Sequence, residues 1–246
     1  MRIVIPARFG STRLEGKPLR ELAGRPLVEH VWRRALEAVG HPGSIVVTSE
    51  DSEVLRAAKG FGASTARTDE SHQSGTDRVA EVARELGWAD DEVVVNLQGD
   101  EPFMPAYMIR AVAEGVTAET PMATIAVPMA DPARATDAGT VKVVMDARGR
   151  AAWFSRLGIP IDRDGAGGVS WFQHVGLYAY RVSTLSRLTT LPPSPAEQAE
   201  KLEQLRALHH GIPIQVVVAR GPAPLGVDTP ADLAEAERLM QESGSR

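Results

Sequence analysis

The segment that follows the first apolar run of the chain contains residue types that bind phosphate. Residues 6–19 read PARFGSTRLEGKPL. This loop supplies two turn-forming glycines and three charged donors, which are Arg8, Gly10, Arg13, Gly16 and Lys17. Its glycines are separated by five residues, one more than in a P-loop, and Pro18 stands where a P-loop carries Ser or Thr. We therefore expect a polyanion-binding loop and not an ATPase site, although an ordinary exposed turn can have a similar sequence.

Two acidic segments could place a divalent cation beside that loop. NLQGDEP (96–102) follows a strongly apolar run, and GVDTPADL (226–233) precedes a helical pattern. An Asp at the end of a buried strand can hold a cation against phosphate oxygens. Asp100 and Asp228 could therefore converge on one metal ion. The alternative is that each carboxylate only caps the turn or helix that follows it.

Composition excludes several other kinds of protein. Of the 246 residues, 43% are hydrophobic and 24% are charged, as in soluble globular proteins. The net charge of −5 argues against general binding of nucleic acid, and we expect no such partner. The chain has no run of about 18 apolar residues and no signal-peptide core, so we expect no membrane span. It also has no cysteine, which fits a cytoplasmic protein.

Short apolar runs alternate with helical patterns along most of the chain. The runs suit parallel strands covered on both faces, and they lie at residues 3–5, 45–47, 93–95 and 216–218. Apolar residues spaced by three and four predict helices from Val28 to Val39 and from Val79 to Leu86. This alternation predicts an α/β fold with an open, wound and mostly parallel sheet. Ligands of such sheets bind at the carboxyl ends of the strands.

The middle of the chain predicts a different arrangement, at about residues 120–180. Strand-like segments follow one another there with few helices between them, at 123–127, 141–145, 151–154 and 175–180. We expect a small antiparallel insertion that contributes to the substrate site and to a dimer surface. The insertion would belong to a single domain covering residues 1–246. The glycine-rich segment 164–168 predicts a loop.

The last part of the chain returns to helical patterns. These begin at Pro193 and end in a helix that runs to about Gln241. Thr229 is a suitable N-cap for that final helix, with Pro230 at its first position.

Taken together, the motifs resemble those of the nucleotidyltransferases that activate sugars, specifically the CMP-KDO synthetases (3-deoxy-manno-octulosonate, or KDO, cytidylyltransferases). Beyond the three segments above, the resemblance extends through RTDESHQSGTDR (67–78), SRLGIPIDRD (155–164), HVGLYAYR (174–181) and PSPAEQAEKLEQLR (193–206). These seven motifs occur in the family's order along nearly the whole chain. The resemblance implies an enzyme with a nucleotide-diphospho-sugar transferase-like fold.

The resemblance also implies which residues bind the nucleotide. Lys17, Asp100 and Arg8 match catalytic positions, and Lys17 is best placed to neutralise charge on the α-phosphate. The positions that match a CTP site are Arg8, Gly10, Ser11, Thr12, Lys17, Arg67, Ser74 and Gln98. Asp100 and Asp228 match the residues that hold Mg²⁺, which is the expected cofactor.

A further set of positions matches residues that contact the sugar acid. This set is Arg156, His174, Tyr178, Glu203 and Gln204. Each also has an ordinary structural interpretation, because a His or Tyr on a strand often packs in the core. Arg156 could instead pair with a nearby Asp, and polar residues in the middle of a helix are usually exposed.

The implied reaction is transfer of CMP from CTP to the anomeric hydroxyl of KDO, with release of pyrophosphate, a step of lipopolysaccharide biosynthesis. The family implies a homodimer formed through the antiparallel insertion. One alternative is a cytidylyltransferase for another acidic acceptor, such as a different 2-keto-3-deoxy sugar acid. Another is a nucleotide-binding regulator without activity. A Rossmann dehydrogenase is a poorer match because no GxGxxG follows the first apolar run.

Overall fold

A computed structural model of the protein describes residues 1–10, 13–129, 131–165 and 168–244. The predicted nucleotide-binding residues Ser11 and Thr12, and part of the predicted glycine-rich loop, therefore lie outside the described residues. The chain divides into two compact units. The first contains residues 1–110 and 224–246, and the second contains residues 111–223. The single domain inferred from the sequence stays a prediction.

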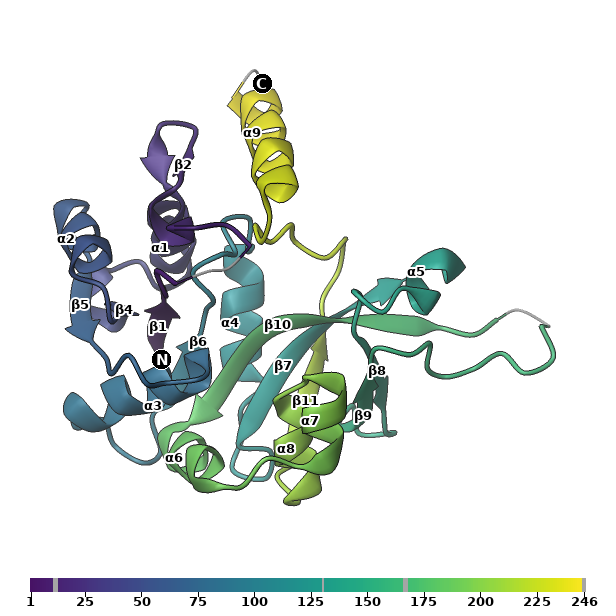
Figure 1. The fold of residues 1–246 in the computed structure, drawn as a ribbon. Coiled ribbons are helices and arrows are strands. Elements are labelled where there is room, and N and C mark those ends of the chain that lie inside the picture. The colour runs from purple at the N-terminus through teal and green to yellow at the C-terminus, as the bar shows by residue number, and fades with distance from the viewer. Residues whose placement is uncertain (11–12, 130, 166–167, 245–246) are drawn as a thin grey trace. The chain divides into compact units, whose positions relative to one another are not determined.

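The first unit is built on four parallel strands in the order β6–β1–β4–β5 (Figure 1). They are β1 (Arg2–Pro6), β4 (Ile45–Ser49), β5 (Ser64–Arg67) and β6 (Val93–Asn96). Ile3, Val4 and Ile5 are fully buried because β1 lies inside the sheet with helices packed against it. The register pairs Ile5 with Val47 and Val4 with Asn96, so the carboxyl ends of β1, β4 and β6 meet at one edge.

Helices connect these strands and pack on the sheet. α1 and α3 both contact β1 and β4, and α2 contacts β4 and β5. The helices that begin in this unit are α1 (Leu27–Val39), α2 (Ser52–Gly60), α3 (Gly75–Glu85), α4 (Ala106–Glu114) and α9 (Pro230–Gly244). The shorter elements are the 3₁₀ turns η1 (Lys17–Leu19) and η2 (Pro42–Ser44), and the paired strands β2 (Glu21–Leu22) and β3 (Arg25–Pro26). The predicted helices α1 and α3 are confirmed.

Side-chain caps fix the starts of two helices near the strand ends. The Ser74 hydroxyl accepts a hydrogen bond from the Asp77 N–H, and the Asp77 carboxylate accepts one from the Ser74 N–H, which forms a capping box on α3. Thr229 and Asp232 form the same reciprocal arrangement at the start of α9. Pro230 is the first residue of that helix, as the sequence predicts.

An apolar cluster joins the C-terminal segment of this unit to its N-terminal part. Its buried members are Leu14, Leu22, Leu27, Val227 and Ala236. The Val227 N–H also donates a hydrogen bond of 2.8 Å to the Asp100 carbonyl. Packing and this hydrogen bond therefore place the segment before α9 beside the loop that follows β6.

The second unit contains the antiparallel strands that the sequence predicts. They are β7 (Met122–Met129), β8 (Lys142–Met145), β9 (Ala151–Ser155) and β10 (Trp171–Arg181). The unit also contains β11 (Ile214–Val218). β10 pairs antiparallel with β7 and β8, β9 pairs antiparallel with β8, and β11 pairs parallel with β7. β10 starts earlier than predicted, and its register against β7 shifts between Val175 and Tyr178. The predicted fold class, with a mostly parallel sheet and a small antiparallel insertion, is confirmed.

The helices of the second unit require one correction. They are α5 (Pro132–Thr136), α6 (Val182–Thr190), α7 (Pro195–Glu200) and α8 (Gln204–His209). Helical structure was expected to return at Pro193, but α6 already begins at Val182, directly after β10. Its apolar face is short and interrupted by Ser and Thr, which weakens the helical pattern in the sequence. None of the described helices is both long and apolar enough to cross a membrane.

Gly99 allows the ends of β1 and β6 to approach each other. A Cβ atom at this position would lie 2.8 Å from the Pro6 carbonyl oxygen, which is backbone and cannot rotate away. We predict that Gly99→Ala lowers the free energy of unfolding by about 1–3 kcal/mol, measured by urea denaturation. The control is Gly60→Ala, because a Cβ at Gly60 meets nothing within 4 Å. Equal stability of the Gly99→Ala variant and the wild type would show that the contact is not restrictive.

Candidate active site

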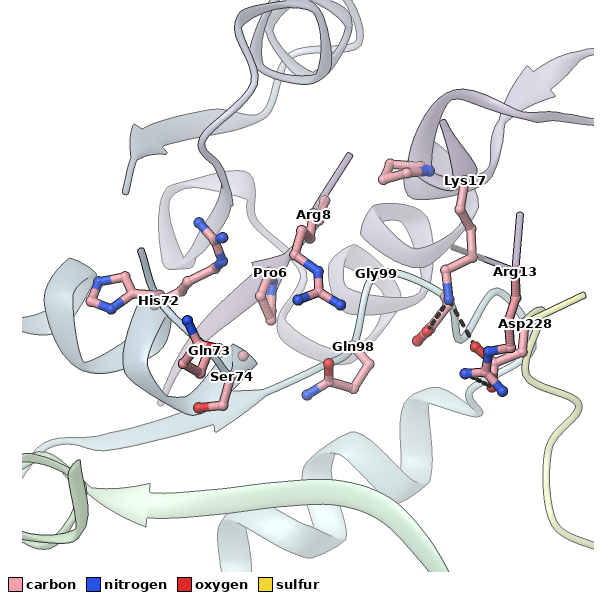
Figure 2. Close-up of a pocket in the computed structure, with 15 residues that line it drawn as sticks. Pro6, Arg8, Arg13, Lys17, His72, Gln73, Ser74, Gln98, Gly99 and Asp228 are labelled. Carbon is pink, nitrogen blue, oxygen red and sulfur yellow. Dashed lines mark hydrogen bonds and ion pairs between the residues drawn. The ribbon is translucent and has the colours of Figure 1, made fainter. Parts of the chain in front are cut away.

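A cavity of about 250 Å³ opens at the carboxyl ends of β1 and β6 in the first unit. Its lining includes six predicted site residues, namely Arg8, Lys17, Ser74, Gln98, Asp100 and Asp228. Figure 2 shows Arg8, Gln98 and Ser74 on one side and Lys17 with Arg13 and Asp228 on the other. These side chains come from four separate segments of the sequence, and the parallel strands bring them to one edge.

The centre of the site is an ion-paired group in which Lys17 lies between two aspartates (Figure 2). Lys17 Nζ is 2.6 Å from Asp100 Oδ2 and 2.9 Å from Asp228 Oδ1. Arg13 Nη2 lies 3.1 Å from the second oxygen of Asp228. The two carboxylates therefore converge on one point, as the sequence suggested they could. The interpretation of Asp228 as only a helix cap is wrong, because Thr229 and Asp232 make the capping hydrogen bonds.

The charge state of Lys17 follows from these neighbours. Burial disfavours its ammonium form, but the negative charges and hydrogen bonds of Asp100 and Asp228 outweigh burial and raise the pKa of Lys17 above its usual value. Lys17 is consequently a fixed cation at neutral pH. A cation in this position can neutralise phosphate oxygens that enter the cavity.

A third acidic side chain, that of Glu101, lies close to Asp100 and Asp228. Burial, with the charges of Asp100 and Asp228 as further causes, raises the pKa of Glu101 to about 8. Its Oε2 atom is buried and has no hydrogen-bond partner among the described residues. Near neutral pH Glu101 is therefore mainly protonated, so two negative charges rather than three surround Lys17.

The donor chemistry of Asp100 and Asp228 fits magnesium. Mg²⁺ is usually bound through one or two carboxylates together with substrate phosphates and water, not by a complete cage of protein ligands. In the part of the chain that the structure describes, no group of three or more His, Cys, Asp or Glu side chains has metal-binding geometry. Two convergent carboxylates that line an open cavity match the incomplete set that Mg²⁺ requires.

The remaining predicted nucleotide-binding residues differ in whether they line the cavity. The Gln98 amide donates to Asn96 Oδ1 at 2.9 Å and packs close to Gly75 at the start of α3. Arg67 is exposed at the end of β5, and neither it nor Gly10 is among the residues lining the cavity. Their roles stay predictions.

The sequence analysis missed Arg78, which lines the cavity although it is only 2% exposed. Its Nη1 lies 3.0 Å from Glu50 Oε2. The available signal was an arginine beside the apolar positions of the α3 pattern, where a solvent-facing charge is not expected.

The five predicted sugar-acid residues all lie in the second unit. The rings of His174 and Tyr178 are 5.4 Å apart despite the register shift in β10. The charge of Glu203 contributes, after burial and Tyr180, to raising the pKa of Tyr178 well above its usual range. Gln204 is 6% exposed at the start of α8, and its buried Nε2 has no hydrogen-bond partner among the described residues. His174, Tyr178 and Glu203 thus lie near one another, and Gln204 directly follows Glu203 in the chain.

Arg156 is held at the end of β9 by backbone acceptors. Its Nε donates to the Glu200 carbonyl at 2.7 Å, and Nη1 donates to the Ala138 carbonyl at 3.0 Å. The alternative pairing with a nearby Asp is not observed in the described residues. Both of these side-chain contacts are to neutral backbone carbonyls.

A comparison with protein-family models decides the family. The model for cytidylyltransferases matches residues 2–214 of the chain. The chain belongs to the cytidylyltransferase family. This confirms the resemblance based on the seven motifs, and it excludes the dehydrogenase alternative.

Individual relatives cover almost the whole chain. The 3-deoxy-manno-octulosonate cytidylyltransferase of Methylococcus capsulatus (strain ATCC 33009 / NCIMB 11132 / Bath) is 49% identical over 249 residues, which are 97% of this chain and 96% of that protein. The enzyme of the same name from Stenotrophomonas maltophilia (strain R551-3) is 47% identical over 254 residues, covering 99% and 98% of the two chains.

Solved structures agree with this family assignment. A structure of CMP:2-keto-3-deoxy-manno-octonic acid synthetase in complex with CTP superimposes with a TM-score of 0.90 at 41% identity, covering 98% of each chain. A cytidylyltransferase from Leptospira borgpetersenii superimposes with a TM-score of 0.62 at 15% identity, which supports the fold alone.

His174 should make stability depend on pH. Burial lowers the pKa of His174 to about 3, and its Nε2 lies 3.0 Å from Thr124 Oγ1. In the unfolded chain the ring takes up a proton near pH 6.5. The buried, neutral His174 therefore contributes fully to the stability of the folded state above pH 6.5, and this contribution is lost as the pH falls towards 3.

We predict that the melting temperature of the wild type falls more between about pH 7.5 and pH 5 than that of His174→Gln. The exposed His209 provides the matched control, since His209→Gln should follow the wild type. Parallel melting curves for the wild type and His174→Gln would contradict a buried, neutral imidazole.

Proposed function

We propose that this chain transfers CMP from CTP to the anomeric hydroxyl of KDO and releases pyrophosphate. The observation that carries the proposal is Lys17 held between Asp100 and Asp228 inside a cavity lined by further cationic side chains. Support also comes from relatives that have this activity by name and match the chain over nearly its full length. A related structure contains CTP itself.

The chain's own residues would promote the reaction by neutralising and aligning the phosphates. An anomeric hydroxyl beside a carboxylate is a poor nucleophile near a polyanion, so the negative charge of the triphosphate must be reduced. Lys17 would stabilise the charge that develops on the α-phosphate, and Arg8 and Arg13 would hold the phosphates that leave as pyrophosphate. Attack in line with the leaving group needs no covalent enzyme intermediate.

Asp100 and Asp228 would hold Mg²⁺ in the same place. When bound, the ion supplies charge neutralisation of phosphate oxygens and lowers the pKa of an oxygen nucleophile. With Mg²⁺ bound, the ion would neutralise the two carboxylates, and Lys17 would instead contact phosphate oxygens of CTP. Both the carboxylate oxygens and the phosphate oxygens would then have a cation nearby.

Residues of the second unit would recognise the sugar acid. Arg156 would bind the carboxylate of KDO, because a guanidinium can form two parallel hydrogen bonds with it. His174 and Gln204 would read hydroxyl groups, and Tyr178 and Glu203 would complete this polar surface. The unpaired Nε2 of Gln204 supports this role, since a buried donor without a partner favours a ligand that supplies an acceptor.

We further propose that the enzyme is a cytoplasmic homodimer serving lipopolysaccharide biosynthesis. The dimer surface would be the antiparallel insertion, where Trp153, Leu157 and Ile161 are 42%, 74% and 81% exposed. Exposed apolar side chains in one region of a chain are typical of an interface.

The function is tested by measuring pyrophosphate release with each nucleoside triphosphate and a panel of acceptors. The proposal expects turnover with CTP and KDO and little with UTP, ATP or GTP. Faster turnover with another 2-keto-3-deoxy sugar acid would identify that compound as the acceptor instead. CTP binding without turnover on any acceptor would favour the regulator alternative and overturn the proposal.

Asp100→Ala should abolish this activity. The change removes one of the two carboxylates that would hold Mg²⁺ and breaks the 2.6 Å contact with Lys17. We expect kcat to fall by at least about a hundredfold while the circular dichroism spectrum is unchanged. Asp90→Ala, at an exposed turn, is the matched control. Full turnover by Asp100→Ala would remove Asp100 from the mechanism.

Metal dependence gives an independent prediction. Treatment with EDTA should eliminate pyrophosphate release, and added Mg²⁺ should restore it, because the two carboxylates repel the triphosphate unless a divalent cation lies between them. The rate is followed as the Mg²⁺ concentration is increased at constant CTP. Undiminished activity after exhaustive chelation would contradict the assignment of Asp100 and Asp228.

A further inference from the structure

We propose that Glu50 and Arg78 are positioning residues that hold residues 6–10, the start of the phosphate-binding loop, in the conformation that binds phosphate. Neither residue would contact the reacting atoms. They would act through Phe9, which lies between Arg8 and the first glycine of the loop. This inference rests on the proposed function, because it concerns how the same cavity accepts CTP.

Glu50 anchors the start of the loop to the neighbouring strand. It follows β4, whose register pairs Thr48 with Pro6 at the end of β1. The Ala7 N–H donates to the Thr48 carbonyl at 2.8 Å, which extends the strand pairing by one residue. The Phe9 N–H then donates to Glu50 Oε1 at 3.2 Å. The backbone around Arg8 is thus fixed on both sides, by Thr48 of β4 and by Glu50 just after this strand.

A carboxylate in this place has the wrong sign for a cavity that binds a polyanion. Arg78 removes the conflict, because its Nη1 lies 3.0 Å from Glu50 Oε2 and its side chain is 2% exposed. The same Nη1 donates to Thr68 Oγ1 at 3.0 Å and to the Asp69 carbonyl at 3.1 Å. A guanidinium that is almost fully buried and whose Nη1 is held by three oxygen atoms is a fixed counter-charge rather than a mobile one.

Phe9 can transmit this anchoring to the catalytic lysine. A Cβ atom at Gly16 would lie 3.4 Å from Cε2 of the Phe9 ring, so the ring packs directly on this glycine. Gly16 adopts the left-handed conformation, with φ of 62°, and directly precedes η1, which begins with Lys17. The Phe9 amide is therefore held by Glu50, while its ring contacts the residue that sets the direction of Lys17.

The test compares Arg78→Met with the double variant Glu50→Gln/Arg78→Met. Arg78→Met leaves the Glu50 carboxylate without its counter-charge, so we expect the KM for CTP to rise at least tenfold with a smaller change in the KM for KDO. In the double variant, Gln keeps an acceptor for the Phe9 N–H and removes the charge. It should recover most of the lost CTP affinity, which a purely structural role of Arg78 would not produce.

Hydrogen exchange of the Phe9 amide gives a second readout that needs neither CTP nor turnover. Exchange should be faster in Arg78→Met and return towards the wild-type rate in the double variant. If Arg78→Met fails to fold, Glu50→Ala and Glu50→Gln replace it. Glu50→Ala, which removes the acceptor, should exchange faster and bind CTP more weakly than Glu50→Gln.

The control is Arg33→Met on α1, which breaks an ion pair of 2.7 Å with Glu29 that is more exposed and lies within one helix. It should change neither the KM for CTP nor exchange at Phe9. The proposal is overturned if the double variant is no better than Arg78→Met, or if Glu50→Ala exchanges like the wild type. A wild type without activity on CTP and KDO would refute the function, whereas the exchange data would still decide the anchoring.

Discussion

The structure of the site depends on one electrostatic constraint, the placement of the Lys17 ammonium between Asp100 and Asp228. Lys17 and Asp228 are 211 positions apart in the sequence, so only the fold brings them together. A cation that lies between two carboxylates offsets their mutual repulsion, so they can converge. The hydrogen bond from Val227 to the Asp100 carbonyl and the apolar cluster beneath it hold the second aspartate in place.

Charge compensation recurs around this centre. Glu101 adjoins the two aspartates, and its raised pKa keeps it mainly protonated at neutral pH. Glu50 reaches the phosphate-binding loop, and the buried guanidinium of Arg78 neutralises it. In each case a negative charge that would repel a triphosphate is removed or paired. The cavity can thereby use carboxylates for metal binding and loop anchoring while it remains suited to a polyanion.

Much of the fold could be predicted because it follows local patterns. Continuous apolar runs identified the parallel strands, and the Thr229–Pro230 pair identified the start of the last helix. Because ligands bind beyond the carboxyl ends of parallel strands, the same patterns pointed to the loops around Lys17 and Asp100. α6 was missed because its short apolar face, which includes Leu185, is interrupted by Ser and Thr.

Other features depend on tertiary contacts that no local pattern records. The sequence shows only that Arg78 stands beside the apolar positions of α3, and the fold shows that its side chain is buried against Glu50. The register shift before Tyr178 and the raised pKa of Glu101 likewise arise from neighbours distant in sequence. The positions of the sugar-acid residues could be predicted from the motif match, but the groups that surround them are known only from the structure.

The central claim is tested most directly by counting tight Mn²⁺ sites with electron paramagnetic resonance in the presence of CTP. Mn²⁺ replaces Mg²⁺ in oxygen-ligand sites and is visible to this method. The account predicts that the wild type binds Mn²⁺ tightly and that Asp100→Asn and Asp228→Asn each remove that binding. Undiminished Mn²⁺ binding by Asp228→Asn would show that the two aspartates do not serve one ion.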